Sequence, residues 1–314
     1  ICRASLWLRS ADRVLVELAT FPAADFDALF ETPQSLPWED WAGPESALPV
    51  RGRSHKSQLT SVPAIQRTVK KALANRLIAK FGSELPESGP AIPVEVSLLD
   101  DQASIDLDTS GAGLHRRGYR QLAAAAQLRE TLAAALVQLS FWKPGRPLID
   151  PFCGTGTIVI EAAMIGRRLA PGRRRAFAAE QWPSMDSQAW REAREEAADA
   201  ALGPLEERII GWDLDAESLK LARYHAEQAG VADDIHFQQR DCLITNPPYG
   251  ERMGSEQEIA ELYQSMPLKF RHLKTWSHYI LTARSDFETL VGQPADRRRK
   301  LYNGRLACTY YQYH

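Results

Sequence analysis

The sequence LITNPPYGER occupies residues 243–252. It begins as an apolar, β-prone run and continues with an asparagine, two prolines and a tyrosine. Neither proline can donate to a strand ladder, so a strand should end there and a stiff loop should follow. Open α/β sheets bind ligands at the carboxyl ends of their strands. The stretch therefore predicts a binding loop at such an edge, although a proline pair alone usually marks a turn.

The side chains of this loop suit a flat heterocycle that carries an exocyclic amine. The amine can donate to the side-chain oxygen of Asn246 and to the carbonyl of Pro247, while the ring stacks on Tyr249. The candidate catalytic residues are Asn246, Pro247, Pro248 and Tyr249.

A second candidate loop lies in the sequence LIDPFCGTGT, residues 148–157. A strand is predicted to end at Asp150 and a helix to run from 158 to 165. Gly154 and Gly156 let the backbone approach a ligand closely. The pattern differs from the dinucleotide-binding G-x-G-x-x-G fingerprint. A tight strand–helix turn without a ligand is the alternative reading.

Both stretches resemble motifs of known enzymes. Asn-Pro-Pro-Tyr resembles the motif of amino-group methyltransferases, which use S-adenosylmethionine (SAM) on adenine or guanine amines. The longer stretch 246–252 resembles the narrower RlmL-type (YpsC-like) family of THUMP-containing 23S rRNA guanine-N2 methyltransferases, and Asp-Pro-x-Cys-Gly-x-Gly resembles SAM motif I. The resemblance implies SAM as cofactor and a class I SAM-dependent methyltransferase fold, which is a Rossmann-like, doubly wound α/β sheet.

The cofactor contacts expected from this resemblance surround the glycine loop. Asp150 is the candidate for holding the ligand's ammonium, and Asp241 resembles the family's acid that bonds the adenine amine. Asp213 ends the strand at 208–213 and is predicted to bond the ribose hydroxyls, with Asp215 as second choice. Cys153 is assigned no nucleophilic role. The predicted cofactor-binding residues are Asp150, Pro151, Cys153, Gly154, Thr155, Gly156, Thr157, Asp213, Leu214, Asp241 and Asn246.

The first third of the chain predicts an α+β module. Strands are expected at 14–18, 94–98 and 104–108, and a helix with one apolar face from Pro63. The sequence PVRGRSHKSQL at 49–59 and the helix after it resemble the THUMP region that precedes the methyltransferase domain in the RlmL-type family, and THUMP modules bind RNA. The candidate RNA contacts are Arg51, Arg53, Lys56, Arg116, Arg117 and Arg120. A solvated charged face is the alternative for such residues.

We expect a THUMP-type RNA-binding region at 1–110, with its start missing, a basic linker at 111–127 and the methyltransferase domain at 128–314. Alternation of strands and helices predicts a parallel sheet, with a hairpin between 279–282 and 305–311 that turns across 297–300. The chain opens at Ile1 in mid-module, and Asp241 stands very close to Asn246. We therefore expect residues to be missing at the start and near Asp241–Cys242.

Composition bounds the class of protein. The 314 residues suffice for two domains, and 44% hydrophobic with 25% charged residues indicates a globular protein. The net charge of −2 requires any nucleic-acid footprint to be local. Four cysteines without a C-x-x-C pair argue against disulfides and zinc and fit a reducing, cytoplasmic location. We expect no metal and no membrane segment, since no apolar run approaches spanning length.

The sequence thus predicts methyl transfer from SAM to the exocyclic N2 amine of a guanine in 23S rRNA or its assembly intermediate. Alternatives are a DNA adenine-N6 methyltransferase, which shares Asn-Pro-Pro-Tyr, and a tRNA guanine-N2 methyltransferase. A non-catalytic RNA-binding or assembly factor with a relic SAM pocket is a further alternative, which the intact motif residues disfavour. The oligomeric state is not specified by the sequence.

Overall fold

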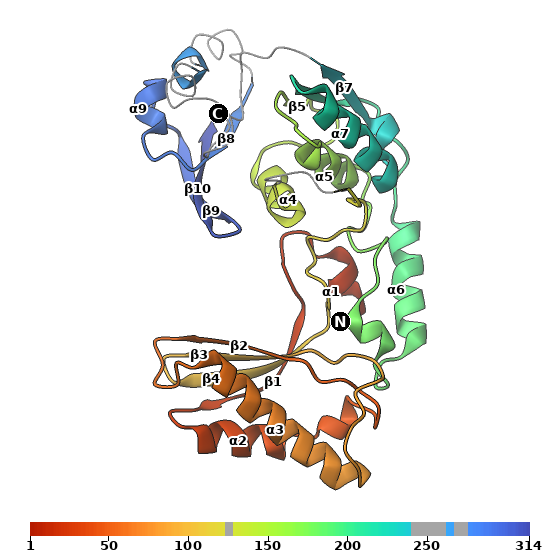
Figure 1. The fold of residues 1–314 in the computed structure, drawn as a ribbon. Coiled ribbons are helices and arrows are strands. Elements are labelled where there is room, and N and C mark those ends of the chain that lie inside the picture. The colour runs from red at the N-terminus through yellow and green to blue at the C-terminus, as the bar shows by residue number, and fades with distance from the viewer. Residues whose placement is uncertain (123–127, 240–261, 267–275) are drawn as a thin grey trace. The chain divides into compact units, whose positions relative to one another are not determined.

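The computed structural model describes residues 1–122, 128–239, 262–266 and 276–314, which form two compact units (Figure 1). The N-terminal unit comprises Ile1–Leu114 and Gly172–Ala197. The C-terminal unit comprises His115–Pro171 and Ala198–His314. The chain therefore leaves the C-terminal unit after Pro171, returns to the N-terminal one, and crosses back after Ala197.

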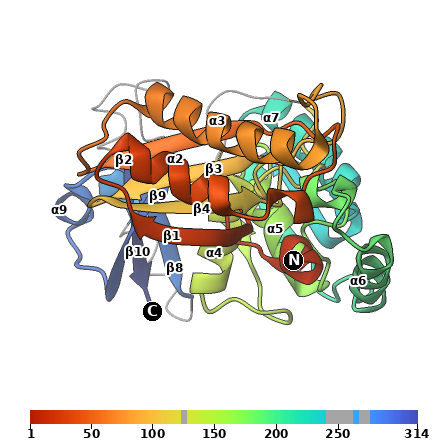
Figure 2. The same ribbon diagram turned by 90° about the horizontal axis from the view of Figure 1, so that it is seen from below.

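A four-stranded sheet with two helices on one face builds the N-terminal unit (Figure 1, Figure 2). Its strand order is β1-β4-β3-β2; β2 and β3 are parallel, and the other neighbours are antiparallel. The helices on that face are α2 and α3. The elements are α1 (Cys2–Trp7), β1 (Leu15–Pro22), α2 (Phe26–Ser35), η1 (Trp38–Asp40), β2 (Val50–His55), α3 (Val62–Phe81), β3 (Val94–Leu99), β4 (Gln102–Asp108), η2 (Ala178–Gln181) and α6 (Ser187–Asp199).

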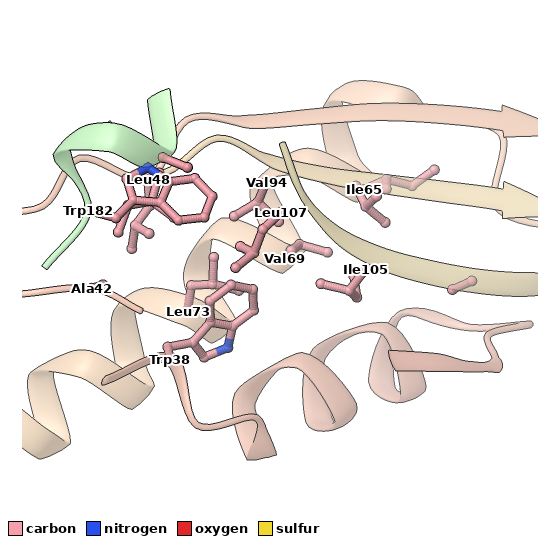
Figure 3. Packing of buried hydrophobic residues seen from close by; sticks show 14 of the residues in the cluster. Trp38, Ala42, Leu48, Ile65, Val69, Leu73, Val94, Ile105, Leu107 and Trp182 are labelled. Carbon is pink, nitrogen blue, oxygen red and sulfur yellow. The ribbon is translucent and has the colours of Figure 1, made fainter. Parts of the chain in front are cut away.

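Helix α3 supplies one wall of this unit's core. A proline in its first turn fits the helical φ angle, and Gly82, at φ +79°, ends it by donating its N–H to the Ile78 carbonyl. The predicted apolar face is confirmed, because four side chains one turn apart are fully buried: Ile65, Val69, Leu73 and Leu77. Figure 3 shows Ile65, Val69 and Leu73 packed against side chains of β3 and β4, such as Val94, Ile105 and Leu107. Each such side chain contributes about 1.5–3 kcal/mol by burial.

Strand β2 covers residues 50–55, where no strand is predicted from the sequence. These residues pair in parallel with β3, from Val50 with Val94 to His55 with Leu99. Gly52 lies on α3, since a Cβ there would come within 3.1 Å of Gln66. The strand was missed because an edge strand with a glycine and alternating basic residues carries little apolar pattern.

Residues 172–197 complete the core of the N-terminal unit rather than that of the C-terminal one. Phe177, Trp182 and Trp190 are all at least 96% buried in this core. Trp182 lies beside Leu48 in Figure 3 and donates its indole N–H to the Ala91 carbonyl at 3.0 Å. Arg175, the last of five arginines between 167 and 175, donates to the carbonyls of Ser110 and Gly113 and so binds residues 172–197 to the backbone of the N-terminal unit.

The C-terminal unit contains a parallel three-stranded sheet, β5-β6-β7, and a second sheet, β8-β10-β9, whose neighbours are antiparallel. The strand–helix alternation predicted from the sequence is confirmed from β5 to β7. The elements are α4 (Glu130–Leu139), β5 (Ile149–Asp150), α5 (Thr157–Gly166), β6 (Ile209–Asp213), α7 (Ala216–Ala229), η3 (Ala232–Asp234), β7 (Ile235–Gln239), β8 (His278–Thr282), α9 (Phe287–Val291), β9 (Arg297–Asn303) and β10 (Leu306–Tyr313).

The final hairpin differs from the expected one. Residues 297–300 do not turn the chain; they belong to strand β9, which pairs with β10 from Arg297–Gln312 to Asn303–Leu306. The turn falls at Gly304, with φ +66°, a conformation that favours glycine. β8 pairs with β10 on its other side. The sequence did not predict this strand, because its first four residues are all basic and show no apolar alternation. An edge strand that is exposed does not require such alternation.

Candidate active site

Two neighbouring strands of the parallel sheet end in carboxylates. β5 ends at Asp150 and β6 at Asp213, and the strands pair in parallel. The glycine loop that follows β5 is bound to β6: Cys153 N donates to the Trp212 carbonyl at 2.8 Å, and Gly154 N donates to Asp213 Oδ2 at 2.8 Å. The structure thus brings both acids and the loop to one edge of the sheet.

The two glycines of this loop do different work. Gly156, at φ +82°, begins α5, and a Cβ there would lie 3.2 Å from both Ala222 and Phe237, so close packing requires glycine. Gly154, at φ +51°, faces open space among the described residues, since an added Cβ would meet none of their atoms within 4 Å. Within this part of the chain, the loop is packed at Gly156 and open at Gly154, where a ligand can approach its backbone.

Asp150 is buried, with 8% of its surface exposed, and its carboxylate accepts a hydrogen bond from Phe152 N at 3.2 Å. Burial raises the pKa of Asp150 to about 7, and the nearby charge of Asp213 also raises it, against the effect of the Phe152 hydrogen bond. A cation placed beside Asp150 would relieve this cost. The site therefore favours a positively charged ligand group.

Asp213 and Asp215 have different roles. Asp213 is partly exposed. One of its carboxylate oxygens accepts a hydrogen bond from Gly154 N and the other accepts one from Asp215 N. Asp215 caps α7: it accepts from the Ser218 hydroxyl and from the backbone N–H groups of Glu217 and Ser218. The hydroxyl hydrogen bond most of all, and then the two backbone ones, lower the pKa of Asp215. The acid next to the loop is therefore Asp213, and Asp215 is occupied by the helix terminus. Between them, Leu214 leaves 62% of its surface exposed.

Cys153 is 6% exposed, and burial raises the pKa of its thiol well above the usual range. A thiol held neutral in this way is a poor nucleophile. This burial agrees with a packing role in the loop and with the expectation that Cys153 does not attack a substrate.

A buried polar layer lies behind the loop and was missed by the sequence reasoning. Arg120 donates to Thr157 Oγ1, at the first residue of α5, and lies 3.5 Å from Glu130, the first residue of α4. His225 lies 3.4 Å from the Thr155 carbonyl, and burial lowers the pKa of its ring. These contacts fix the loop relative to α4, α5 and α7.

A second buried pair lies just below. Arg117 and Glu161 are 3% and 0% exposed, and Arg117 Nε lies 3.3 Å from Glu161 Oε1. Tyr119 OH is 3.5 Å from the same oxygen. A lone acid among the apolar residues of α5 was the signal available in the sequence. The predicted RNA contact of Arg117 does not fit this burial, and Arg120 is engaged with the helix termini, whereas Arg116 is exposed.

The predicted catalytic residues Asn246, Pro247, Pro248 and Tyr249 lie outside the described residues, as does Asp241. The arrangement around the glycine loop can nevertheless be compared with SAM, the cofactor expected from the sequence. SAM carries an ammonium, a ribose with two hydroxyls and an adenine. The site has one matching feature for each of these groups: buried Asp150 for the ammonium, partly exposed Asp213 for the ribose and exposed Leu214 for the adenine. The open side of Gly154 leaves room for the part of SAM that links the ammonium to the ribose.

The other predicted RNA contacts lie on the N-terminal unit. Arg51, Arg53 and His55 alternate along the exposed positions of β2, the edge strand, and Lys56 follows. Arg53 donates to Ser97 Oγ, and Arg51 lies 3.7 Å from Asp108. A shallow groove of about 550 Å³ lies between α3 and residues 48–50, which lead into β2, and Arg67, Lys70 and Lys71 of α3 line it. Both β2 and α3 thus carry basic side chains on the N-terminal unit.

Among the described residues, no helix is long and apolar enough to cross a membrane. In the same part of the chain, no group of three or more His, Cys, Asp or Glu side chains could hold a metal ion.

Curated relatives and solved structures resemble the whole chain. YpsC of Bacillus subtilis, whose name assigns it provisionally to the RNA methyltransferases, is 44% identical over all of this chain and 85% of its own length. The ribosomal RNA large subunit methyltransferase K/L of Methylococcus capsulatus is 36% identical over 98% of this chain, which spans only 44% of that protein.

Two crystal structures match the whole chain with the same TM-score. SMU.472 complexed with SAH, the form SAM takes after losing its methyl group, is 40% identical with a TM-score of 0.92 and covers 100% of this chain and 86% of its own. A Listeria monocytogenes protein described as a predicted N6-adenine-specific DNA methylase is 45% identical, also with a TM-score of 0.92, covering 100% and 85%.

Two families match the chain in succession. Residues 23–108 match the THUMP domain. Residues 117–312 match the family described as RMKL-like, methyltransferase domain, which covers more than half of the chain. The chain therefore belongs to the RMKL-like methyltransferases, SAM-dependent enzymes with a class I fold, and carries a THUMP domain in front of the methyltransferase domain.

Proposed function

We propose that this enzyme transfers the methyl group of SAM to the exocyclic N2 amine of a guanine in 23S rRNA or its assembly intermediate. The observation that carries the proposal is the open glycine loop between Asp150 and Asp213, in a chain that also contains Asn246-Pro-Pro-Tyr after an apolar run. The name of the K/L relative, a ribosomal RNA methyltransferase, supports the substrate class.

In the proposed cofactor site, this chain's residues bind and orient the donor. Asp150 holds the ammonium, and Asp213 accepts hydrogen bonds from the ribose hydroxyls. Leu214 packs on the adenine, and Asp241 accepts a hydrogen bond from the adenine amine. The backbone of the glycine loop lies against the amino-acid end of SAM. This loop runs from Pro151 to Thr157 and includes Cys153, Gly154, Thr155 and Gly156. When bound, SAM supplies an electrophilic methyl group on a sulfonium.

The assignment of Asp150 makes SAM affinity depend on pH. Its pKa is raised to about 7 in the free protein, and only the charged carboxylate holds an ammonium strongly. Binding therefore favours the deprotonated form, so affinity should rise with pH up to about 7 and fall roughly tenfold per unit below it. Calorimetric Kd values for SAM between pH 5.5 and 7 measure this. Asp150→Asn should bind weakly with a flat profile, whereas a flat profile in the unmodified enzyme would contradict the assignment.

At the acceptor, the loop at 246–249 prepares a poor nucleophile. The lone pair of an aryl amine is delocalised into its ring. Hydrogen bonds from the amine to Asn246 and the Pro247 carbonyl favour a pyramidal nitrogen and aim the lone pair at the methyl group, while Pro248 stiffens the loop and Tyr249 stacks on the base. A paired base must be extruded first, at a cost of a few kcal/mol. The methylated nitrogen then loses its proton readily, so no strong general base is needed.

We propose that the N-terminal region positions the RNA. Arg51, Arg53 and Lys56 on and after β2, together with Arg116, contact phosphates, which fix orientation without reading sequence. Residues 1–110 act as the RNA-binding region, 111–127 as the linker and 128–314 as the methyltransferase domain, apart from 172–197, which complete the core of the N-terminal unit. We place the enzyme in the cytoplasm.

A DNA adenine-N6 methyltransferase is the second candidate, because the Listeria relative is described as a DNA methylase. The THUMP domain favours RNA over this alternative. A tRNA guanine-N2 methyltransferase is the third, since it shares the same architecture in outline.

The substrate class is tested by supplying the purified enzyme with methyl-labelled SAM and one of three acceptors: 23S rRNA from a strain lacking this gene, duplex DNA or bulk tRNA. Label should appear in the rRNA at least about tenfold above the other two, and nuclease digestion should release N2-methylguanosine. Mass mapping of rRNA from the deletion strain should then show one missing methylguanine. Label in DNA as N6-methyladenine would replace the proposal with the second candidate.

A further inference from the structure

The β9–β10 hairpin concentrates positive charge at one free edge of the C-terminal unit. β9 is the edge strand of its sheet, and its residues 297–300 read Arg-Arg-Arg-Lys, all exposed. The turn adds an exposed Arg305. Five cations therefore occupy nine consecutive positions, in a chain whose net charge is −2.

Most of this charge is not neutralised within the described part of the chain. Arg298 pairs with Glu288 of α9 at 2.7 Å. For the described residues, the structure contains no ion pair that involves Arg297, Arg299, Lys300 or Arg305. Cations without acids beside them keep their attraction for a polyanion.

An exposed aromatic ring accompanies the cations. Tyr302 leaves 55% of its surface exposed, and Lys300 lies over its ring with Nζ 5.6 Å from the centroid. The two residues share one face of β9, since side chains alternate along a strand. Ala307, the partner of Tyr302 across the hairpin, is also exposed, so nothing bulky on β10 covers the ring there. A flat, exposed ring between cations suits an unpaired base of a nucleic-acid strand.

The hairpin tip lies at the active-site end of the C-terminal unit. α4 runs beside β10 in the same direction: Tyr310 OH donates to the Leu136 carbonyl, and Gln312 Nε2 donates to the Leu139 carbonyl. The first turn of α4 therefore lies toward the tip. That first turn is bound to the glycine-loop end of α5 through Arg120, which donates to Thr157 and approaches Glu130.

We propose that the outer half of this hairpin is an RNA-contact surface separate from the THUMP domain, with Lys300 and Arg305 on phosphates and Tyr302 stacking on an unpaired base. It holds the single-stranded segment next to the base that enters the active site. The inference rests on the proposed RNA substrate, and it deepens that proposal by placing a contact at the catalytic domain itself.

Charges on an edge strand also have a purely structural use, because they block pairing with another chain. That use requires charge of either sign and no exposed tyrosine. Reversing the sign therefore separates the two roles: glutamates at 300 and 305 keep the edge charged but repel phosphates.

Binding is measured by fluorescence anisotropy with a labelled 20-nucleotide single-stranded RNA of mixed sequence and the full chain at about 0.1 M salt. Lys300→Glu with Arg305→Glu should weaken binding at least about tenfold and flatten the salt dependence. The control is Arg208→Glu with Lys220→Glu, two exposed cations of the same unit, and should change affinity less than about threefold. Tyr302→Leu should weaken binding by about fivefold to a hundredfold, and Tyr302→Phe should retain it.

Each variant is first shown to be folded and monodisperse by circular dichroism and size-exclusion chromatography, and to bind SAM as the unmodified enzyme does. RNA affinities equal to those of the control would overturn the proposal and leave edge protection as the role of these charges. The unmodified enzyme could methylate only DNA, while the hairpin variants still lose RNA binding. That result would support the hairpin as a nucleic-acid surface and reject the proposed function, so the two failures are distinguishable.

Discussion

Asn246→Ala is expected to abolish methyl transfer while SAM binding survives. In the proposed mechanism the amide oxygen of Asn246 accepts a hydrogen bond from the target amine and aims its lone pair. Alignment and preorganised hydrogen bonding each supply several kcal/mol, and loss of a single such group costs roughly a hundredfold to a thousandfold in rate. The Pro247 carbonyl alone cannot fix the direction of the lone pair, because a single hydrogen bond leaves the amine free to rotate, so the expected loss lies at the upper end of that range.

The measurement compares single-turnover rates, with the enzyme in excess over rRNA, and calorimetric Kd values for SAM. Asn75→Ala on the exposed side of α3 is the matched control and should leave both quantities unchanged. If Asn246→Ala weakens SAM binding as much as it slows transfer, Asn246 would act mainly through the cofactor contact also predicted for it, and the role of an aligning group would be rejected.

Glu161→Ala is expected to cost about 3–5 kcal/mol of folding free energy, the usual effect of removing one partner of a buried ion pair. Arg117 and Glu161 are almost completely buried, and their guanidinium and carboxylate lie 3.3 Å apart. Removing the carboxylate leaves the buried cation without this counter-charge and leaves Tyr119 OH without this oxygen. The loss should appear as a lower urea midpoint in circular dichroism.

The control for this prediction is Glu217→Ala, since Glu217 pairs with Lys220 at the surface and both side chains are about 80% exposed. Its midpoint should not move. Replacing both members of the buried pair, as in Arg117→Met with Glu161→Leu, should recover much of the loss, because an apolar pair of similar volume needs no counter-charge. Equal destabilisation by the single and double variants would argue that volume, not charge, is what the site requires.

Local signals predicted the framework well. Pro63 and Gly82 delimit α3, and the spacing of its apolar residues fixed the buried face. The strand ending at Asp150 and the positive φ of Gly154 and Gly156 follow from short-range steric rules that a sequence displays directly.

Long-range partners were beyond such rules. The stretch around Arg117 looks like a basic, glycine-broken linker, and only Glu161, 44 residues later, turns it into a buried anchor. The same holds for Arg175, whose acceptors at Ser110 and Gly113 lie more than 60 residues earlier. The placements of Asn246 to Tyr249 and of Asp241 lie outside the described residues and stay predictions.

The return of residues 172–197 to the N-terminal unit has a consequence for how these modules can be exchanged or taken apart. A gene cut at the linker would separate the first 114 residues from Phe177, Trp182 and Trp190, which complete their hydrophobic interior. The N-terminal fragment would then expose the apolar residues that these aromatic side chains cover, and the C-terminal fragment would expose the aromatic side chains themselves. Shuffling by end-to-end fusion is thereby disfavoured, and a single protease nick in the linker leaves two pieces that stay together until they are denatured.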